Sequence, residues 1–341
     1  MTARRVLTGL VPLLLLAATA CGDDGGGGES TSESGKKLNK VTLTLNWYPY
    51  GEHAPFYYGK AQKIFEKHGI DLAIRAGQGS QKTVQATGAG QSDFGWADTP
   101  ALLGGVDSGV KVKSLGVFLQ TTPSSVQFFT AQDIKTPADL KGKTIAGTAG
   151  DALSKTFPVF LRKNDVGQSD VKVQNTDPAG KIAAVISGKT DGLLGYASDQ
   201  GPIMADKAKK EVGYLRFADH GLNFYSNGLI TGTRYLADNG DVATRMVKAV
   251  SESFAAAQQA PGPAVAAMAG ASEQLPPQKV LSEQFATTVT LLHTPATRGK
   301  APGVNTDGDW QRTIDVFAEA GVVKNPKKVS DYWDAAVAAK G

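Results

Sequence analysis

The fold of this chain is decided by residues 43–60, which read LTLNWYPYGEHAPFYYGK. Alternating apolar side chains from Val41 to Leu45 predict a half-buried strand, and the apolar spacing that follows predicts a helix from Phe56 to His68. Between them lies a turn rich in aromatic and polar groups. A strand that leads into a helix in an open α/β sheet leaves its last side chains and the first helical N–H groups at one crevice. The turn therefore predicts one wall of a small-molecule site.

The first twenty residues predict an export signal. Arg4 and Arg5 precede an apolar run, Val6 to Ala20, that is too short to span a bilayer permanently. The run ends in small residues directly before Cys21, the only cysteine in the chain, and so resembles a bacterial lipoprotein signal whose cleavage leaves this cysteine lipidated. An ordinary secretory signal beside a chance cysteine is the alternative. A single cysteine excludes an internal disulfide and any cysteine-rich metal site.

Residues 21–39 predict a flexible tether, because Gly, Ser, Asp, Glu and Lys dominate them and bury too little apolar surface to order a chain. The body from residue 40 onward, about 300 residues, is long enough for two lobes with separate cores. The formal net charge is only +4 and the basic residues are dispersed, so the composition gives no support for nucleic acid as a partner. We expect a protein on the extracytoplasmic face of a bacterial cell membrane, anchored by a lipid on Cys21.

Short apolar runs and helical patterns alternate through most of the body. After the first strand and helix, strands are expected at 71–75, 93–96, 112–119, 144–146, 171–174, 192–194, 214–217 and 228–231. Helical segments separate many of them, one of which begins at Pro100 with Thr99 as its N-cap. This alternation predicts an α/β protein with mixed sheets flanked by helices.

Several short motifs, in this order and spacing, resemble the substrate-binding proteins that serve ABC importers of thiamine-pyrimidine precursors, sulfonates and nitrate. They are Leu45-Asn46-Trp47-Tyr48-Pro49, His53-Ala54-Pro55, Tyr57-Tyr58-Gly59-Lys60, Asp93-Phe94-Gly95, Thr136-Pro137-Ala138-Asp139-Leu140-Lys141-Gly142-Lys143, Gly188-Lys189-Thr190-Asp191 and the segment from Trp310 to Val323. The resemblance implies a two-lobed, type II periplasmic-binding-protein-like fold with the ligand cleft between the lobes. Lobe one would comprise residues 40–125 and 229–341, and lobe two residues 126–228.

The same resemblance implies the partners: a small-molecule ligand, and the permease and ATPase subunits of an ABC importer, with the binding protein itself a monomer. It implies no cofactor and no metal.

In lobe one, the resemblance and the chemistry of the turns give eight candidate ligand-binding residues: Asn46, Trp47, Tyr48, Glu52, His53, Trp96, Asp98 and Thr99. Aromatic faces suit flat or cationic ligands, and an amide or carboxylate suits the edge of a nitrogenous ring. Each residue type also has a structural alternative. A tryptophan is usually core, an asparagine can close a turn, a glutamate can sit at a helix start, and Asp98 or Thr99 can cap a helix.

In lobe two, the candidates follow two expected strands and the second crossover: Thr148, Ala149, Gly150, Tyr196, Asp199 and Tyr225. Small residues at 148–150 let a ligand approach the backbone before a helix. Tyr196 offers a ring for stacking, whereas Tyr225 could serve the hinge as well as the ligand.

An enzyme is the less favoured interpretation. His53 and Lys60 loosely resemble positions of a fungal pyrimidine synthase with this fold, but that synthase needs a cysteine-rich motif that this chain lacks. Among binders, aromatic and acidic candidates favour a pyrimidine-type thiamine precursor or a related nitrogenous ring. A sulfonate or nitrate is the alternative, but anion sites prefer arginine, and none falls in a candidate turn.

Overall fold

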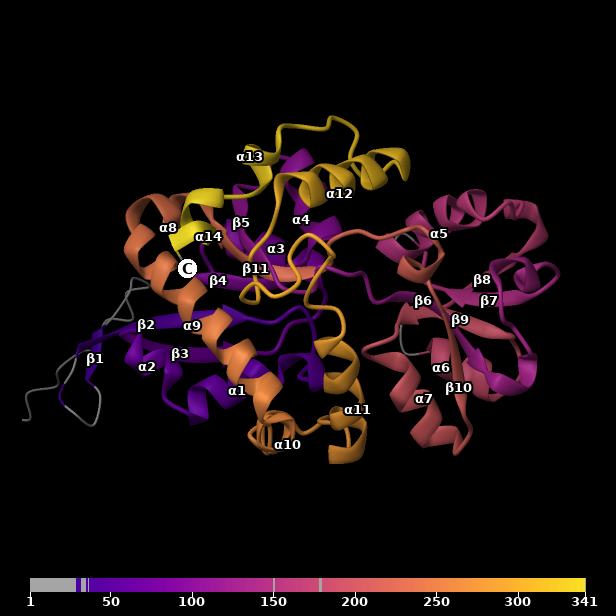
Figure 1. Ribbon diagram of the computed structural model, residues 1–341, viewed down its shortest axis with the longest axis horizontal. Helices are drawn as coiled ribbons and strands as arrows, with labels where there is room; N and C mark the ends of the chain where they lie inside the picture. Colours follow the sequence, from indigo (N-terminus) through magenta and orange to yellow (C-terminus); the bar gives the residue numbers. More distant parts are fainter. Residues whose placement is uncertain (1–28, 32–34, 36, 150, 178–179, 341) are drawn as a thin grey trace, which may run out of the picture.

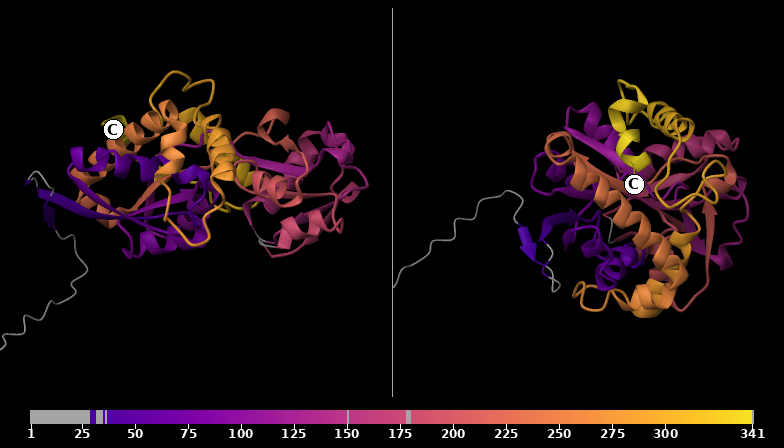
Figure 2. Two further views of the ribbon diagram at one scale, coloured as in Figure 1. Left: turned by 90° about the horizontal axis from the view of Figure 1, so that it is seen from below. Right: turned by 60° about the vertical axis from the view of Figure 1, so that its left-hand side comes forward.

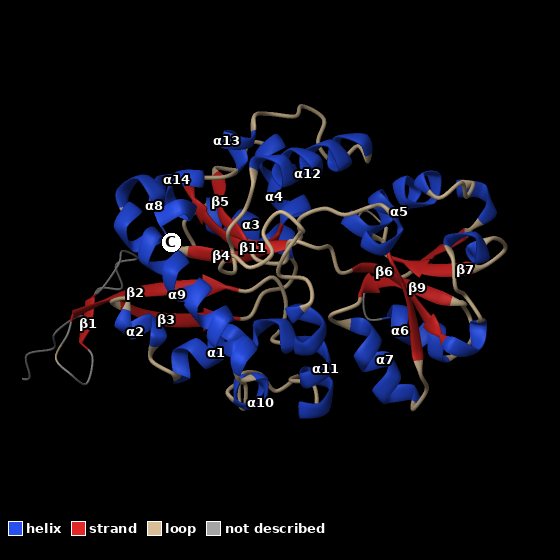
Figure 3. Cartoon of the chain, viewed as in Figure 1, coloured by secondary structure: helices blue, strands red, loops and turns tan. Residues whose placement is uncertain are grey.

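The computed structural model describes residues 29–31, 35, 37–149, 151–177 and 180–340. Two β-sheets lie side by side, each with its own helices, and form two lobes joined by two extended segments (Figures 1 and 3). The view from below shows the same division into two bodies (Figure 2). The predicted α/β, two-lobed architecture is therefore confirmed.

The sheet of lobe one has six strands. Their order is β1-β2-β4-β11-β5, and β3 pairs with β2 off this path. The strands are β1 (Glu29–Thr31), β2 (Lys37–Thr44), β3 (Ile70–Arg75), β4 (Phe94–Asp98), β5 (Val112–Val117) and β11 (Asn227–Gly232). Strand β2 is parallel to β3 and β4, whereas β11 is antiparallel to β4 and β5. The carboxyl ends of β2 and β4 consequently lie at one edge of the sheet, where open α/β sheets bind ligands.

The sheet of lobe two has five strands in the order β10-β6-β9-β7-β8. They are β6 (Ser124–Phe129), β7 (Thr144–Gly147), β8 (Lys172–Asn175), β9 (Gly192–Tyr196) and β10 (Val212–Arg216). Strand β7 is parallel to β8 and β9, and β6 is antiparallel to β9 and β10. Both sheets are thus mixed, as expected.

Helices cover both sheets. Lobe one carries α1 (Ala54–Ala61), α2 (Ile64–Lys67), α3 (Ser80–Gly88), α4 (Thr99–Asp107), α8 (Thr233–Asp238), α9 (Gly240–Gln259), α10 (Pro261–Ala266), α11 (Gln278–Val289), α12 (Asp307–Glu319), α13 (Val329–Tyr332) and α14 (Ala335–Lys340). Lobe two carries α5 (Ala152–Lys163), α6 (Gly180–Ile186) and α7 (Gln200–Ala208). Short 3-10 turns occupy Gly51–His53, Thr130–Gln132, Pro137–Leu140, Gln168–Asp170 and Ala218–His220.

Each lobe has an aromatic core. In lobe one, Trp96 of β4 stacks on Phe254 of α9 with ring centroids 5.5 Å apart, and Phe56 meets both rings edge-on. In lobe two, Phe160 of α5 stacks on Phe217 at 4.2 Å. Burial of such large rings supplies much of the favourable free energy of folding and fixes each sheet against its helices.

The crossovers between the lobes lie between β5 and β6 and between β10 and β11. The expected boundaries at 125/126 and 228/229 fall inside strands β6 and β11. Each boundary moves two residues towards the N-terminus, to the start of its strand.

Strand β6 was not expected because its Ser125 and Gln127 are polar. Both are buried, and Gln127 Nε2 donates to Ser125 Oγ at 3.1 Å, which donates to the Gly195 carbonyl at 3.0 Å.

Two other expectations need correction. The single helix expected from Phe56 to His68 is broken at Lys63, whose φ of 55° is left-handed and cannot continue a helix. The expected tether, residues 21–39, overlaps strand β1 and the start of β2, which pair with each other. The export signal and Cys21 lie outside the described residues. None of the helices in the described ranges is both long and apolar enough to cross a membrane.

Candidate functional site

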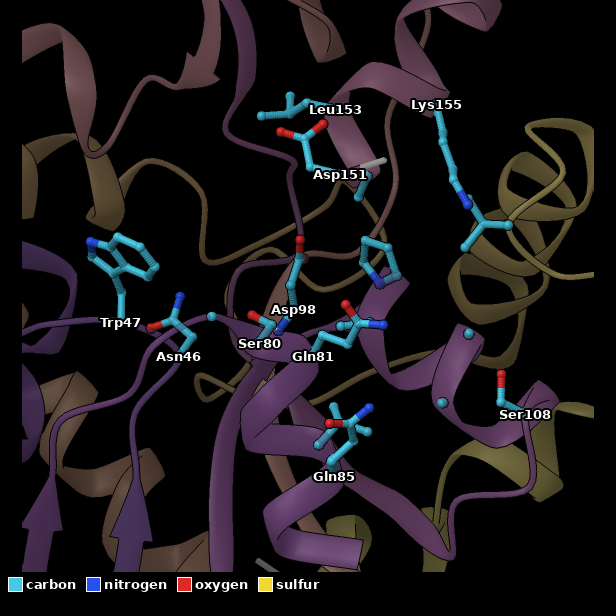
Figure 4. Close-up of a pocket in the computed structure, with 18 of the residues that line it drawn as sticks. Asn46, Trp47, Ser80, Gln81, Gln85, Asp98, Ser108, Asp151, Leu153 and Lys155 are labelled. Carbon is cyan, nitrogen blue, oxygen red and sulfur yellow. The ribbon is translucent and has the colours of Figure 1, made fainter. Parts of the chain in front are cut away.

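A cleft of about 790 Å³ lies where the carboxyl ends of β2 and β4 face those of β7 and β9. Lobe one contributes Asn46, Trp47, Tyr50, Ser80 and Asp98, and lobe two contributes the first turn of α5 with Lys181, Tyr196 and Asp199. In Figure 4, Trp47 and Asn46 stand on one side of Asp98, with Asp151 and Leu153 facing them from lobe two. The cleft extends between α3 and α4 towards Lys324.

Asn46 is held by a buried histidine. The backbone N–H of Tyr50 donates to His53 Nδ1 at 3.3 Å, so the proton of the neutral ring is on Nε2, which donates to Asn46 Oδ1 at 2.7 Å. Burial lowers the pKa of His53 to about 3, which keeps the ring neutral. The amide oxygen of Asn46 is thereby occupied, and its amide nitrogen is the donor on the cleft side (Figure 4). His53 itself is fully buried, so its expected contact with ligand is replaced by a positioning role.

Glu52 does not line the cleft. It is 0% exposed and accepts hydrogen bonds from the Tyr50 hydroxyl at 2.6 Å, Trp96 Nε1 at 2.7 Å and Asn227 Nδ2 at 2.5 Å. Burial raises the pKa of Glu52 to about 7, although these three donors act in the opposite direction. Through Trp96 of β4 and Asn227 of β11, Glu52 fixes the turn to the sheet on the side away from the cleft. Its assignment as a ligand-binding residue is therefore corrected.

The two candidate tryptophans have opposite environments. Trp47 is 38% exposed and lines the cleft, with Tyr48 edge-on to it at 5.6 Å. Trp96 is 0% exposed inside the aromatic core, so its expected contact with ligand is corrected. Tyr48 is half-buried and lies outside the cleft lining, and its role in binding stays a prediction.

Asp98 joins the lobes. Its Oδ1 accepts from the Ser226 hydroxyl at 3.0 Å, and its Oδ2 accepts from the Tyr196 hydroxyl of lobe two. Its backbone precedes α4, but its side chain makes no capping hydrogen bond to that helix. Burial raises the pKa of Asp98 to about 6. The structure thus places Asp98 and Tyr196 together on the cleft, one from each lobe.

A second link between the lobes passes through Gln284 of α11. Its Nε2 donates to the Asp199 carbonyl at 3.0 Å, and its Oε1 accepts from the backbone N–H of Gly51 at 2.9 Å. Burial raises the pKa of Asp199 to about 6, and nearby Lys181 acts in the opposite direction. Gln284 therefore connects the turn of lobe one to the cleft wall of lobe two.

The residues expected to line the cleft between β7 and α5 are Thr148, Ala149 and Gly150. Thr148 and Ala149 lie outside the lining, and Gly150 lies outside the described residues. The described lining includes Asp151, whose Oδ1 accepts from Ser154 N at 2.7 Å and caps α5. The first turn of α5 therefore contributes to this wall of the cleft.

Thr99 and Tyr225 are structural. The Thr99 hydroxyl donates to the Ser226 carbonyl at 2.6 Å, and both groups are buried. Tyr225 meets Trp310 edge-on at 5.5 Å, and its hydroxyl accepts from Thr306 N at 3.3 Å. Neither residue lines the cleft, so both expected ligand contacts are corrected.

Among the residues at or behind the cleft that were missed are Tyr50, Ser80, Lys181 and Gln284. Tyr50 stood in the quoted turn and could have been named by its position. Ser80 is the first residue of α3, after β3, a connection that the same strand-to-helix rule covers. Lys181 and Gln284 carried no signal, because single polar residues on helices usually face solvent.

Residues 51–264 match the protein family described as NMT1/THI5 like, which is well over half of the chain. The chain belongs to the NMT1/THI5-like family. The family resemblance read from the motifs is thereby confirmed.

Individual relatives of this NMT1/THI5-like chain are distant. The formylaminopyrimidine-binding protein of Halalkalibacterium halodurans is 23% identical over 229 residues, which cover 66% of this chain and 68% of that protein. The 4-amino-5-hydroxymethyl-2-methylpyrimidine phosphate synthase of Uromyces fabae is 27% identical over 169 residues, covering 48% of this chain and 47% of that protein. Relatives therefore include a named binding protein and a named synthase.

Among solved structures, the aliphatic sulphonate binding protein SsuA of Escherichia coli superposes with a TM-score of 0.68 at 17% identity. The superposition covers 86% of this chain and 92% of SsuA. This likeness shows that the NMT1/THI5-like chain has the periplasmic-binding-protein-like fold. In the described ranges, no three His, Cys, Asp or Glu side chains converge as a metal site would require.

Proposed function

We propose that this protein is an extracytoplasmic solute-binding lipoprotein that captures a flat, amine-bearing heteroaromatic ligand, such as a pyrimidine-type thiamine precursor, and delivers it to an ABC importer. Binding rather than turnover is the function. The observation that carries the proposal is the placement of Trp47, Asn46 and Asp98 on one wall of the cleft, facing Tyr196 and Asp199.

The charges around the cleft support an amine. Asp98, Asp151 and Asp199 line it between the lobes, where Lys181 is the buried cation, and the lining also includes Asp107 and the exposed Lys155 and Lys324. Carboxylates accept hydrogen bonds from an exocyclic amine or a protonated ring nitrogen and stabilise its positive charge. Because burial raises the pKa of Asp98 and Asp199 to about 6, an approaching cation also favours their ionised forms.

The exposed ring of Trp47 favours a flat ligand. The exposed face of Trp47 gives a ring a surface to stack on without disturbing the core, since the core tryptophan is a different residue, Trp96. The Asn46 amide, fixed by His53, adds a directional donor beside it. One relative is named as a formylaminopyrimidine-binding protein, and a pyrimidine is a flat nitrogenous ring.

A sulfonate or nitrate is the second candidate ligand. The lysines of the lining favour it: Lys181 is a buried ammonium on the cleft wall, and the exposed Lys155 and Lys324 line the cleft as well. The three carboxylates around the same space oppose an anion, and no arginine lines the cleft within the described residues. The amine is therefore the better supported ligand.

A thermal-shift panel tests the proposal. The protein is heated with 4-amino-2-methylpyrimidine, taurine or nitrate, each well above micromolar concentration. A ligand at a hundredfold excess over its Kd stabilises the folded state by roughly 3 kcal/mol. Stabilisation by the aminopyrimidine alone supports the proposal, a response to taurine or nitrate alone contradicts the ligand class, and turnover of the pyrimidine contradicts the binding role.

A further inference from the structure

Lys181 is a buried cation on the lobe-two wall of the cleft. It lies in the first turn of α6 and is 4% exposed. Its Nζ donates to the carbonyl of Leu194, near the end of β9 and two residues before Tyr196. This hydrogen bond places the ammonium beside the end of β9, the strand that carries the tyrosine joining the two lobes.

The ammonium has more donors than partners. A lysine Nζ carries three N–H groups, and a buried charge is costly unless its hydrogen bonds are satisfied. Within the part of the chain that the structure describes, the Leu194 carbonyl at 2.8 Å is the acceptor bonded to Nζ. The remaining donors belong to a group that lines the cleft, where a ligand atom can reach them.

The charges around Lys181 determine which kind of ligand oxygen can accept its free N–H groups. Asp151 and Asp199 both act on Lys181 through space, and both line the same cleft. Two carboxylates beside one ammonium leave an excess of negative charge, so a fully charged oxyanion would meet repulsion as well as attraction. A neutral oxygen, such as a carbonyl, accepts the N–H groups without that repulsion.

We propose that Lys181 selects ligands that carry an uncharged carbonyl-type oxygen on the side of the ring that faces lobe two. This inference rests on the proposed function and narrows its ligand class. The ligand then has two ends: an amine-bearing edge that Asn46 and Asp98 recognise, and a neutral oxygen that Lys181 recognises. A purely structural Lys181, holding α6 to β9, would give no such preference.

The test uses three rings of nearly the same shape. They are 4-amino-2-methylpyrimidines with isopropyl, acetyl or carboxylate at position 5, so that only the oxygen and its charge change. Titration calorimetry compares the unaltered protein with Lys181→Met, which keeps the length of the side chain and removes the donors. Lys189→Met is the matched control, because Lys189 is an exposed lysine just beyond the same helix.

We expect the acetyl ring to bind the unaltered protein about tenfold more tightly than the isopropyl ring, as one hydrogen bond to a charged donor predicts. The carboxylate ring should bind less tightly than the acetyl ring. Lys181→Met should abolish the preference for the acetyl ring, and Lys189→Met should retain it.

An equal affinity of the unaltered protein for the acetyl and isopropyl rings would overturn the inference, and this result needs no variant to fold. A preference that survives in Lys181→Met, or a carboxylate ring that binds best, would overturn it as well. In all these cases the rings still bind, so the proposed function stands. If no ring binds, the unsubstituted 4-amino-2-methylpyrimidine included, the proposed function itself is wrong.

Discussion

The hydroxyl of Tyr196 in lobe two donates a hydrogen bond to the carboxylate of Asp98 in lobe one. Because Asp98 ends β4 and Tyr196 ends β9, this bond joins the carboxyl ends of strands from both sheets across the cleft. Gln284 makes a second link, from Gly51 to Asp199. Asp98, Tyr196 and Asp199 thus line the site and also take part in the contacts that hold the lobes together.

Tyr196→Phe should loosen the contact between the two lobes. It removes the donor to Asp98 and leaves a buried carboxylate oxygen without that partner, which costs about 1–3 kcal/mol for a hydrogen bond to a charged group. We expect a larger radius of gyration in small-angle X-ray scattering, reversed by saturating ligand. Tyr214→Phe is the control, because it removes a hydroxyl from β10 outside the cleft lining. An unchanged radius in Tyr196→Phe would show that this bond does not hold the lobes.

Glu52→Gln should change how stability depends on pH. The pKa of Glu52 is raised from 4.5 to about 7, so the folded state favours the protonated form. The resulting stabilisation is complete below about pH 4.5 and is lost as the pH rises to about 7. Between these values the wild type should lose about 3 kcal/mol more unfolding free energy than Glu52→Gln, measured by urea titration. Parallel curves for the two proteins would contradict the assignment.

Trp47→Ala and Trp96→Ala should have opposite effects. Trp47 is a cleft residue, so its removal should weaken ligand binding at least tenfold and leave the melting temperature nearly unchanged. Trp96 lies in the core and donates to Glu52, so its removal should cost about 3–5 kcal/mol of stability. Calorimetric binding and thermal melting of both variants provide the check. Unfolding of Trp47→Ala with intact binding by Trp96→Ala would reverse the assignment.

His53→Ala should weaken binding through Asn46. His53 is fully buried, and its side-chain donor bonds the Asn46 oxygen at 2.7 Å. Without that bond the amide can rotate, and we expect roughly a tenfold loss of affinity, the value of one oriented hydrogen bond. Asn46→Ala should lose a similar factor, and the double variant should lose little more. Additive losses would show that the two residues act separately.

The sequence predicted the lobes better than the site. Alternating strands and helices, with motifs in a fixed order, were enough for the two-lobed fold, because each motif marks a strand end or a turn. They also indicated which turns reach the cleft, and Asn46, Trp47, Asp98, Tyr196 and Asp199 all lie on its wall. Their roles in binding remain predictions.

The direction of side chains within a turn was the part that could not be predicted. Glu52 and Trp96 come from the correct segments, but they face each other behind the wall, and nothing local distinguishes that side from the cleft side. Gln284 is missed for a different reason: it contacts Gly51 across 233 positions of sequence. Such contacts depend on the packing of distant helices, which no local pattern specifies.

The most direct test of the central claim is titration calorimetry of 4-amino-2-methylpyrimidine into the wild type and into Asp98→Asn at pH 7.5. The account predicts saturable binding at one site and an affinity at least tenfold lower in Asp98→Asn, since the amide cannot supply the carboxylate's charge. Heat from taurine or nitrate with none from the aminopyrimidine, or equal pyrimidine affinities in both proteins, would contradict it.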